Sequence, residues 1–150
     1  MQTKILMVCL GNICRSPLAE GILKSKIDPS KVFVDSAGTG HWHVGDGPDK
    51  RSIAVGKRYN IDITDQRGRQ FSAKDFDDFD LIYVMDNSNK ENVLALAQND
   101  SHKEKVKLIL DKIFPGENVD VPDPYFGGNT GFENVYQMLD KACEEIAKEF

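Results

Sequence analysis

The segment CLGNICRSP, residues 9–17, holds two cysteines and an arginine within seven positions. A short loop ahead of a helix can turn several backbone N–H groups toward one point, where the helix dipole adds partial positive charge. Arg15 offers a planar fork that binds two oxygens of a phosphate. Cys9 lies at the base of the loop, where this positive potential favours its thiolate form. The pattern indicates a loop that holds a phosphate in line with a cysteine nucleophile.

Three other interpretations of these residues are weighed against the phosphate loop. Cys9 could be a small buried hydrophobe, with Arg15 a surface charge. Cys9 and Cys14 could form a disulfide, which in a reducing compartment would be regulatory rather than structural. The two cysteines with His41 and His43 could bind zinc, but His-x-His does not place both side chains on one helical face, and the nearby arginine would oppose a cation. The phosphate loop is favoured because an apolar run, the C-x5-R-S spacing and a helix start occur together.

Apolar runs alternate with helical segments along the chain. Residues 4–8 (KILMV) form a continuous apolar run, typical of a strand buried on both faces. Ser16 and Pro17 indicate a helix start with Ser16 as its N-cap, and Gly11 is expected to permit the intervening backbone turn. Further strands are predicted at 32–34, 80–85 and 105–110, loops at 35–40 and 116–131, and helices at 16–27, 48–59, 86–96 and 132–148.

This alternation predicts an α/β domain whose parallel sheet is covered by helices on both faces. In such sheets, ligands bind beyond the carboxyl ends of the strands. Cys9, Ser36 and Asp86 each lie near the end of a predicted strand. The loop that starts at Cys9 is therefore expected at the functional edge of the sheet.

The composition bounds the class of protein. The chain has 150 residues, 40% hydrophobic and 29% charged, with a formal net charge of −5 at pH 7. The acidic balance argues against a nucleic-acid or membrane partner, so an anion site has to be positive locally. Three cysteines are too few for a secreted disulfide framework. No apolar run is as long as the hydrophobic region of a signal peptide or the roughly 18 residues of a membrane span. We expect a cytoplasmic protein with reduced thiols.

Four segments resemble the low-molecular-weight protein tyrosine phosphatases. They are VCLGNICRSPLAEG near the N-terminus, DSAGT at 35–39, DFDLIYVMDNSN at 78–89 and VPDPYFGG at 121–128. The resemblance covers essentially the whole chain, residues 1–150. It implies a single-domain, three-layer α/β fold in which a four-stranded parallel sheet has helices on both faces and a phosphate-binding loop after the first strand. It also implies hydrolysis of phosphotyrosine and small aryl phosphates, with neither a metal nor an organic cofactor.

The resemblance assigns roles residue by residue. Cys9 is the nucleophile that forms a phosphocysteine intermediate, and Arg15 binds the phosphate and stabilises the transferred group. Asp123 is the general acid for the leaving phenol and then the base that activates water. These roles agree with the chemistry, since phosphoryl transfer needs positioning, charge stabilisation and a proton donor opposite the nucleophile. Other positions match the phosphate-binding loop (Leu10, Gly11, Asn12, Ile13, Cys14, Ser16), its support (Ser36, Asp86) and a substrate slot (Trp42, Tyr125, Phe126).

Three aromatic residues are expected to wall a slot for the substrate ring. Trp42, Tyr125 and Phe126 lie in Gly- and Pro-rich loops on the catalytic edge, where a wall is favoured over core packing. A slot with its phosphate site at the bottom suits phosphotyrosine and disfavours the shorter phosphoserine. Ile13 also resembles the tyrosine-phosphatase branch of the family, because related enzymes that act on phosphoarginine tend to carry Thr at this position.

Two positions depart from the family pattern. Gln66 falls where many members have a His, so it keeps a hydrogen-bonding group but cannot titrate. Phe126 replaces a frequent Tyr, which removes a hydroxyl from the wall and a phosphorylation site. His41 and His43, on either side of Trp42, are expected to face solvent.

Two rival functions are compatible with a phosphate loop. An arsenate reductase on the same fold uses further cysteines downstream to carry oxidation away, and only Cys143 follows Cys14 here. A phosphopeptide binder without activity needs no nucleophile or acid, whereas Cys9, Arg15 and Asp123 are all present.

The expected ligands are a phosphotyrosine-containing protein or peptide, and inorganic phosphate or other oxyanions in the loop. A monomer or weak dimer is expected. Cys14 is not needed for the chemistry and lies in the same tight loop as Cys9. A Cys9–Cys14 disulfide formed under peroxide would protect Cys9 from irreversible oxidation, which predicts a redox-sensitive cysteine.

Overall fold

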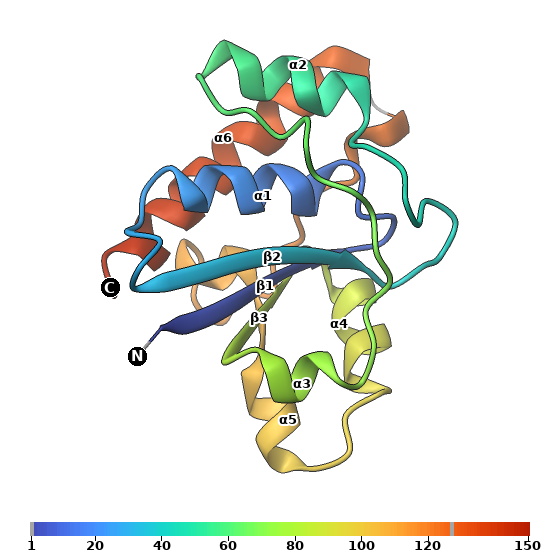
Figure 1. Ribbon diagram of the computed structural model, residues 1–150, viewed down its shortest axis with the longest axis vertical. Helices are drawn as coiled ribbons and strands as arrows, with labels where there is room; N and C mark the ends of the chain where they lie inside the picture. The colour runs from blue at the N-terminus through green and yellow to red at the C-terminus, as the bar shows by residue number, and fades with distance from the viewer. Residues whose placement is uncertain (1, 127) are drawn as a thin grey trace.

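The computed structural model describes residues 2–126 and 128–150, with the backbone alone for residues 126 and 128–130. Within this part of the chain, a parallel four-stranded sheet in the order β2-β1-β3-β4 forms the middle layer (Figure 1). Helices cover both faces of the sheet, which confirms the predicted fold class. The strands are β1 (Thr3–Cys9), β2 (Val32–Gly38), β3 (Leu81–Val84) and β4 (Val106–Leu108).

The central strand β1 is apolar on both sides because it faces two separate cores. Ile5 and Met7 pack into one core, and Leu6 and Val8 pack into the other. This is the alternation of a strand whose successive side chains point to opposite faces of the sheet. Burial on both faces fixes β1, and the loop that begins at Cys9 therefore starts from a rigid position.

The helices divide between the two cores (Figure 1). The first core packs under α1 (Arg15–Lys24), α2 (Lys50–Arg58) and α6 (Gly128–Ala147). The second packs against α3 (Asp75–Asp78), α4 (Asn87–Leu94) and α5 (Asp100–Lys105). Two short 3₁₀ helices, η1 (Ile109–Lys112) and η2 (Pro124–Phe126), complete the described elements.

The start of α1 differs from the prediction. The helix begins at Arg15 with Cys14 at the N-cap and no side-chain cap, whereas Ser16 was the expected cap. Ser16 lies in the first turn, where its hydroxyl bonds the sulfur of Cys9 instead of a helix N–H group. A functional contact has replaced a local cap at this helix start. The helix ends at Lys24, before the predicted end at residue 27.

Other boundaries also differ from the predictions. Residues 35–38 belong to β2 rather than to a loop, because they pair in register with residues 6–9 of β1. The strand predicted at 105–110 is confined to β4, with η1 following it directly. Neither α3 nor α5 shows apolar periodicity, so the sequence pattern missed both. The segment predicted as a loop at 116–131 contains η2 and the first residues of α6.

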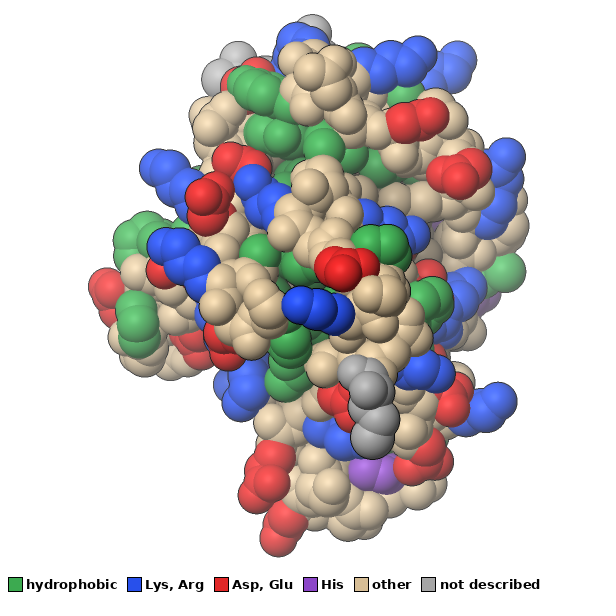
Figure 2. All heavy atoms as spheres, turned by 60° about the vertical axis from the view of Figure 1, so that its left-hand side comes forward, with side chains coloured by type: hydrophobic (Ala, Val, Ile, Leu, Met, Phe, Trp, Pro, Cys, Tyr) green, Lys and Arg blue, Asp and Glu red, His purple; other side chains and the backbone are tan. Residues whose placement is uncertain are grey.

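The surface has both signs of charge mixed together. Figure 2 shows basic and acidic side chains interspersed on the face that it presents. With a net charge of −5, anion binding has to depend on a local arrangement of donors. Among the helices of the described residues, none has the length and apolar character needed to cross a bilayer.

Candidate active site

The loop between β1 and α1 curls around the sulfur of Cys9. The backbone N–H of Asn12 donates to Cys9 Sγ at 3.3 Å, and Ser16 Oγ lies 3.0 Å from the same sulfur. Asn12 takes the left-handed conformation, with φ of 57°, which asparagine tolerates better than most residues. Gly11 was expected to permit the backbone turn of this loop, and the residue with positive φ is its neighbour Asn12. Gly11 lies close under His43, and a Cβ there would be 3.2 Å from Cδ2 of His43, so that ring would have to shift by a few tenths of an ångström.

The end of β2 supports the loop from below. The N–H groups of Thr39 and Gly40 donate to the carbonyls of Cys9 and Leu10, both at 2.9 Å. Gly38 lets the two segments approach this closely, since a Cβ there would lie 2.8 Å from the carbonyl oxygen of Leu10. The position of the loop is thus determined by two neighbouring strands.

A buried polar network holds the inside of the loop. The Asn12 side chain donates to Ser16 Oγ at 2.8 Å and to Ser36 Oγ at 3.0 Å. Ser36 donates in turn to Glu20 Oε1 at 2.7 Å, and Lys24 Nζ donates to the other carboxylate oxygen of Glu20 at 2.6 Å. Burial raises the pKa of Glu20, against the opposing effect of its bonds to Lys24 and Ser36. Such a network is rigid when each member has a partner, so the loop keeps its shape.

The sequence prediction missed Glu20, although one signal was available. Glu20 precedes Lys24 by four residues, which pairs the two charges on one helix face. Glu20 lies on the opposite side of α1 from Leu18 and Ile22, but residues 15–23 are all buried, so this side of the helix is covered as well. An acid on a buried helix face is a candidate for a structural hydrogen-bond network.

Arg15 is almost wholly buried, at 2% exposure, and is held from two sides. Its Nη1 donates to Asp86 Oδ2 at 2.7 Å and to the carbonyl of Val121 at 2.9 Å. Its Nη2 lies 3.9 Å from Asp123 Oδ2. Burial acts to lower the pKa of Arg15, but Cys9, Asp86 and Asp123 together raise it above its usual value. The guanidinium therefore stays charged in one fixed orientation.

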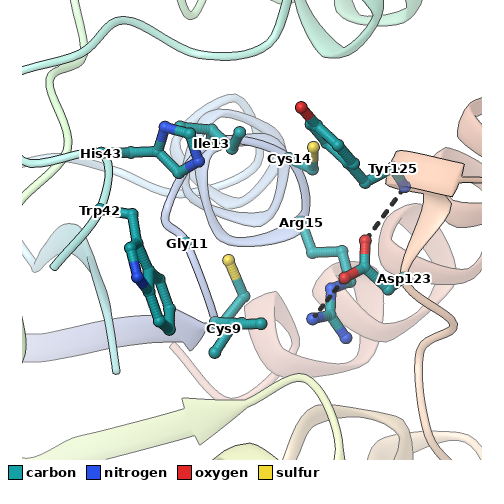
Figure 3. A pocket seen from close by; sticks show the side chains of 10 residues that line it. Cys9, Gly11, Ile13, Cys14, Arg15, Trp42, His43, Asp123 and Tyr125 are labelled. Carbon is teal, nitrogen blue, oxygen red and sulfur yellow. Dashed lines mark hydrogen bonds and ion pairs between the residues drawn. The ribbon is translucent and has the colours of Figure 1, made fainter. Parts of the chain in front are cut away.

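These residues open onto one pocket of about 210 Å³ (Figure 3). Cys9 and Arg15 lie at its centre, Trp42 lies on one side, and Asp123 and Tyr125 lie opposite. Trp42 is 65% exposed, so its ring is a wall rather than part of the core. The full lining is Cys9, Leu10, Gly11, Ile13, Cys14, Arg15, Trp42, His43, Asp123 and Tyr125.

Asp123 comes from the segment that precedes η2. Its Oδ1 accepts a hydrogen bond from the backbone N–H of Tyr125 at 3.0 Å, and its side chain is 39% exposed. Pro122 and Pro124 flank it and restrict the backbone on both sides. The carboxyl group is thus held at the pocket while remaining accessible to a ligand and to water.

The structure brings together the side chains predicted for the slot, with one exception. The side chain of Phe126 lies outside what the structure describes. The expectation that His43 faces solvent holds in part, because its side chain is 36% exposed but also lines the pocket, with its Nδ1 3.1 Å from Asp46 Oδ2. His41 is exposed and stacks on Trp42, as a solvent-facing residue would. Gln66 lies behind the loop, where its amide donates to the carbonyl of Pro17 at 3.0 Å.

Cys9 and Cys14 are both free thiols, and they differ in their surroundings. Cys14 also lines the pocket, but burial, with the negative charge of Asp49, raises its pKa to about 12. It is therefore a protonated thiol at neutral pH. Across residues 2–126 and 128–150, no group of three or more His, Cys, Asp or Glu side chains is placed to hold a metal ion.

The fold and the pocket define a site for a tetrahedral oxyanion with a cysteine sulfur beneath it. The sequence matches the family model described as low molecular weight phosphotyrosine protein phosphatase over residues 4–150. The chain therefore belongs to this family.

Individual relatives align over nearly their full lengths. The protein slr0328 of Synechocystis sp. is 46% identical over 147 residues, which cover 95% of this chain and 93% of that protein. A crystal structure of a protein tyrosine phosphatase from Entamoeba histolytica, with Hepes in its active site, is 38% identical with a TM-score of 0.91 and covers 99% of this chain and 96% of its own. The crystal structure of DARP, a drosophila arginine phosphatase, is 37% identical with a TM-score of 0.89. The match covers 98% of this chain and 97% of that chain.

Proposed function

We propose that this protein is a protein tyrosine phosphatase that hydrolyses phosphotyrosine and small aryl phosphates through a phosphocysteine intermediate. One observation carries the proposal: Cys9 and Arg15 of one loop and Asp123 of a segment more than 100 residues further along the chain converge on a single pocket. Binding of an anion needs the loop and Arg15 alone. A sulfur under the anion and a carboxyl group on the opposite side are the two further groups that ester hydrolysis needs.

In the first step, the Cys9 thiolate attacks phosphorus while the bond from phosphorus to the phenolic oxygen breaks. The electron pair of that bond goes to the phenolic oxygen, which takes the proton of Asp123 as it leaves. Arg15 and the loop N–H groups stabilise the charge on the equatorial oxygens of the transferring group. Asp86 and Val121 keep the guanidinium aligned during this step.

In the second step, water attacks the phosphorus of phosphocysteine and gives its proton to the Asp123 carboxylate. The sulfur–phosphorus bond breaks, its electron pair returns to Cys9, and inorganic phosphate is released. The hydroxyl of Ser16 and the N–H of Asn12 stabilise the sulfur as it leaves. The active form of the enzyme is thus restored without a cofactor entering either step.

The aromatic lining of the pocket supports an aromatic phosphate as the substrate. Trp42 and Tyr125 face each other across the pocket above Cys9 (Figure 3). A phosphotyrosine ring fits between two such walls while its phosphate reaches the loop, and a phosphoserine side chain is shorter. Ile13 lines the same pocket. By the resemblance to the family, an Ile at this position rather than a Thr favours phosphotyrosine over phosphoarginine.

We expect a phosphotyrosine peptide to have a kcat/KM at least about tenfold above that of matched phosphoserine and phosphoarginine peptides. The three peptides share one sequence, and released phosphate is measured. The variant Ile13→Thr should raise the activity toward phosphoarginine relative to phosphotyrosine. A wild-type preference for phosphoarginine would replace this proposal with an arginine phosphatase, and hydrolysis of none would remove the enzyme assignment.

We further propose that peroxide closes a Cys9–Cys14 disulfide. Cys9 sulfenic acid, formed by peroxide, would condense with the Cys14 thiol and release water. Because the pKa of Cys14 is about 12, closure should become faster as the pH rises, since more of Cys14 is then thiolate. After peroxide and then thiol, Cys14→Ser should recover less activity than wild type or Cys143→Ala. Equal recovery in all three proteins would contradict this role.

The remaining parts of the proposal are a single phosphatase domain over residues 1–150, a cytoplasmic location, and a monomeric or weakly dimeric state. Inorganic phosphate and other oxyanions are expected to compete with substrate for the loop. The single domain is supported by the continuous match to one family model over residues 4–150.

A further inference from the structure

The segment that carries Asp123 is tied to the N-terminus of α4 by one residue. The backbone N–H of Asn87 donates to Asp120 Oδ1 at 2.8 Å, and its side-chain amide donates to the same oxygen at 2.7 Å. The same amide also donates to the carbonyl of Asn118 at 3.0 Å. Asn87 is the first residue of α4, so the Asp120 carboxylate also meets the positive end of a helix.

The next residue of that segment is fixed through its backbone. The N–H of Val121 donates to the carbonyl of Met85 at 2.8 Å, and its carbonyl accepts from Arg15 Nη1 at 2.9 Å. Arg15 is held in turn by Asp86. Residues 85–87 therefore contact both the phosphate-binding arginine and the segment that leads to Asp123.

The chain between this anchor and Asp123 has little freedom. Pro122 locks its own φ and restricts the conformation of Val121, while Pro124 restricts Asp123 in the same way. A displacement at residues 120–121 is therefore passed on to the carboxyl of Asp123 instead of being absorbed by soft dihedral angles. Upstream, residues 114–118 are exposed, so that side of the segment offers little packing to hold it.

We propose that Asp120 and Asn87 are positioning residues for the general acid Asp123. They fix the segment of residues 120–123 to the corner of the fold that also orients Arg15. This inference rests on the proposed phosphatase function, and it assigns Asp120 no contact with substrate. Its role is to keep the Asp123 carboxyl within reach of the leaving oxygen, where small displacements have large effects on the rate.

The test compares two substrates whose leaving groups differ in their need for a proton. For Asp120→Ala and for Asn87→Ala, we expect kcat/KM with phosphotyrosine to fall about tenfold. With p-nitrophenyl phosphate, whose leaving group is already acidic, we expect a loss of about twofold or less. Asp120→Asn keeps an acceptor oxygen for Asn87 and should stay near wild type. Asp62→Ala is the matched control, since Asp62 is an exposed carboxylate that accepts two bonds from Thr64 outside the pocket.

A second comparison separates positioning from a general loss of structure. In an Asp123→Ala background, adding Asp120→Ala should change kcat/KM for phosphotyrosine by less than about twofold, because the group to be positioned is absent. A further tenfold loss in that background would overturn the inference. So would equal losses on both substrates in the single variants, or no loss at all. A wild-type protein that hydrolyses neither substrate would instead overturn the proposed function.

Discussion

Replacing Cys9 by Ser is expected to lower kcat for aryl phosphates by about 10⁴-fold or more, because a hydroxyl at this position is not ionised at neutral pH. The serine oxygen occupies nearly the same place, and Ser16 and Asn12 remain able to bond it. The phosphate site itself is left intact. The substitution is therefore expected to slow the formation of the bond to phosphorus and to leave phosphate binding unchanged.

Two measurements check this expectation. Rapid acid quenching after mixing with a ³²P-labelled substrate should leave label on wild type and none on Cys9→Ser. Inorganic phosphate should still raise the melting temperature of Cys9→Ser, which shows a folded loop. Cys143→Ala is the control, since this buried thiol bonds the carbonyl of Ala19 and lies outside the pocket. Turnover by Cys9→Ser comparable to wild type would remove Cys9 as the nucleophile.

The sequence was most informative where a function depends on neighbouring residues. Cys9 and Arg15 share one loop, and their spacing, together with the apolar run before them and the helix start after them, indicates an anion site between them. The apolar run of β1 and the alternation of elements predicted the sheet for a similar reason, because burial on both faces leaves a local signature. Asp123 could be assigned only through the VPDPYFGG segment and its resemblance to a family, since an Asp between two prolines is also a common turn.

The sequence was least informative where contacts join distant segments. Nothing near His43 indicates that its ring covers Gly11, and nothing near Asp120 indicates a partner on α4. The N-cap assigned to Ser16 was wrong because a sulfur seven residues away outcompetes the local cap. Residues 35–38 are polar enough to suggest a loop, and their pairing with β1 makes them a strand. Local propensity is a weak guide wherever tertiary contacts decide the outcome.

Replacing Asp123 by Ala is expected to lower kcat/KM for phosphotyrosine by about 10²- to 10⁴-fold, the range for loss of a general acid. The same change should lower kcat/KM for p-nitrophenyl phosphate much less, because its phenolate leaves without a proton. The parameter kcat/KM is the appropriate measure, because it reports the steps up to loss of the phenol and excludes hydrolysis of phosphocysteine. Arg15 loses a neighbouring charge 3.9 Å away, but Asp86 and Val121 still hold it.

The second role of Asp123 gives an independent signature. Without the carboxylate that accepts a proton from water, phosphocysteine should be hydrolysed slowly whichever substrate formed it. Asp123→Ala mixed with p-nitrophenyl phosphate should therefore release one equivalent of p-nitrophenol in a burst, followed by a slow steady state. Equal losses of kcat/KM on both substrates would remove Asp123 as the acid, and a steady state as fast as that of wild type would remove it as the base. Since the two outcomes are separate, they test whether one carboxyl group, fixed between Pro122 and Pro124, serves both steps.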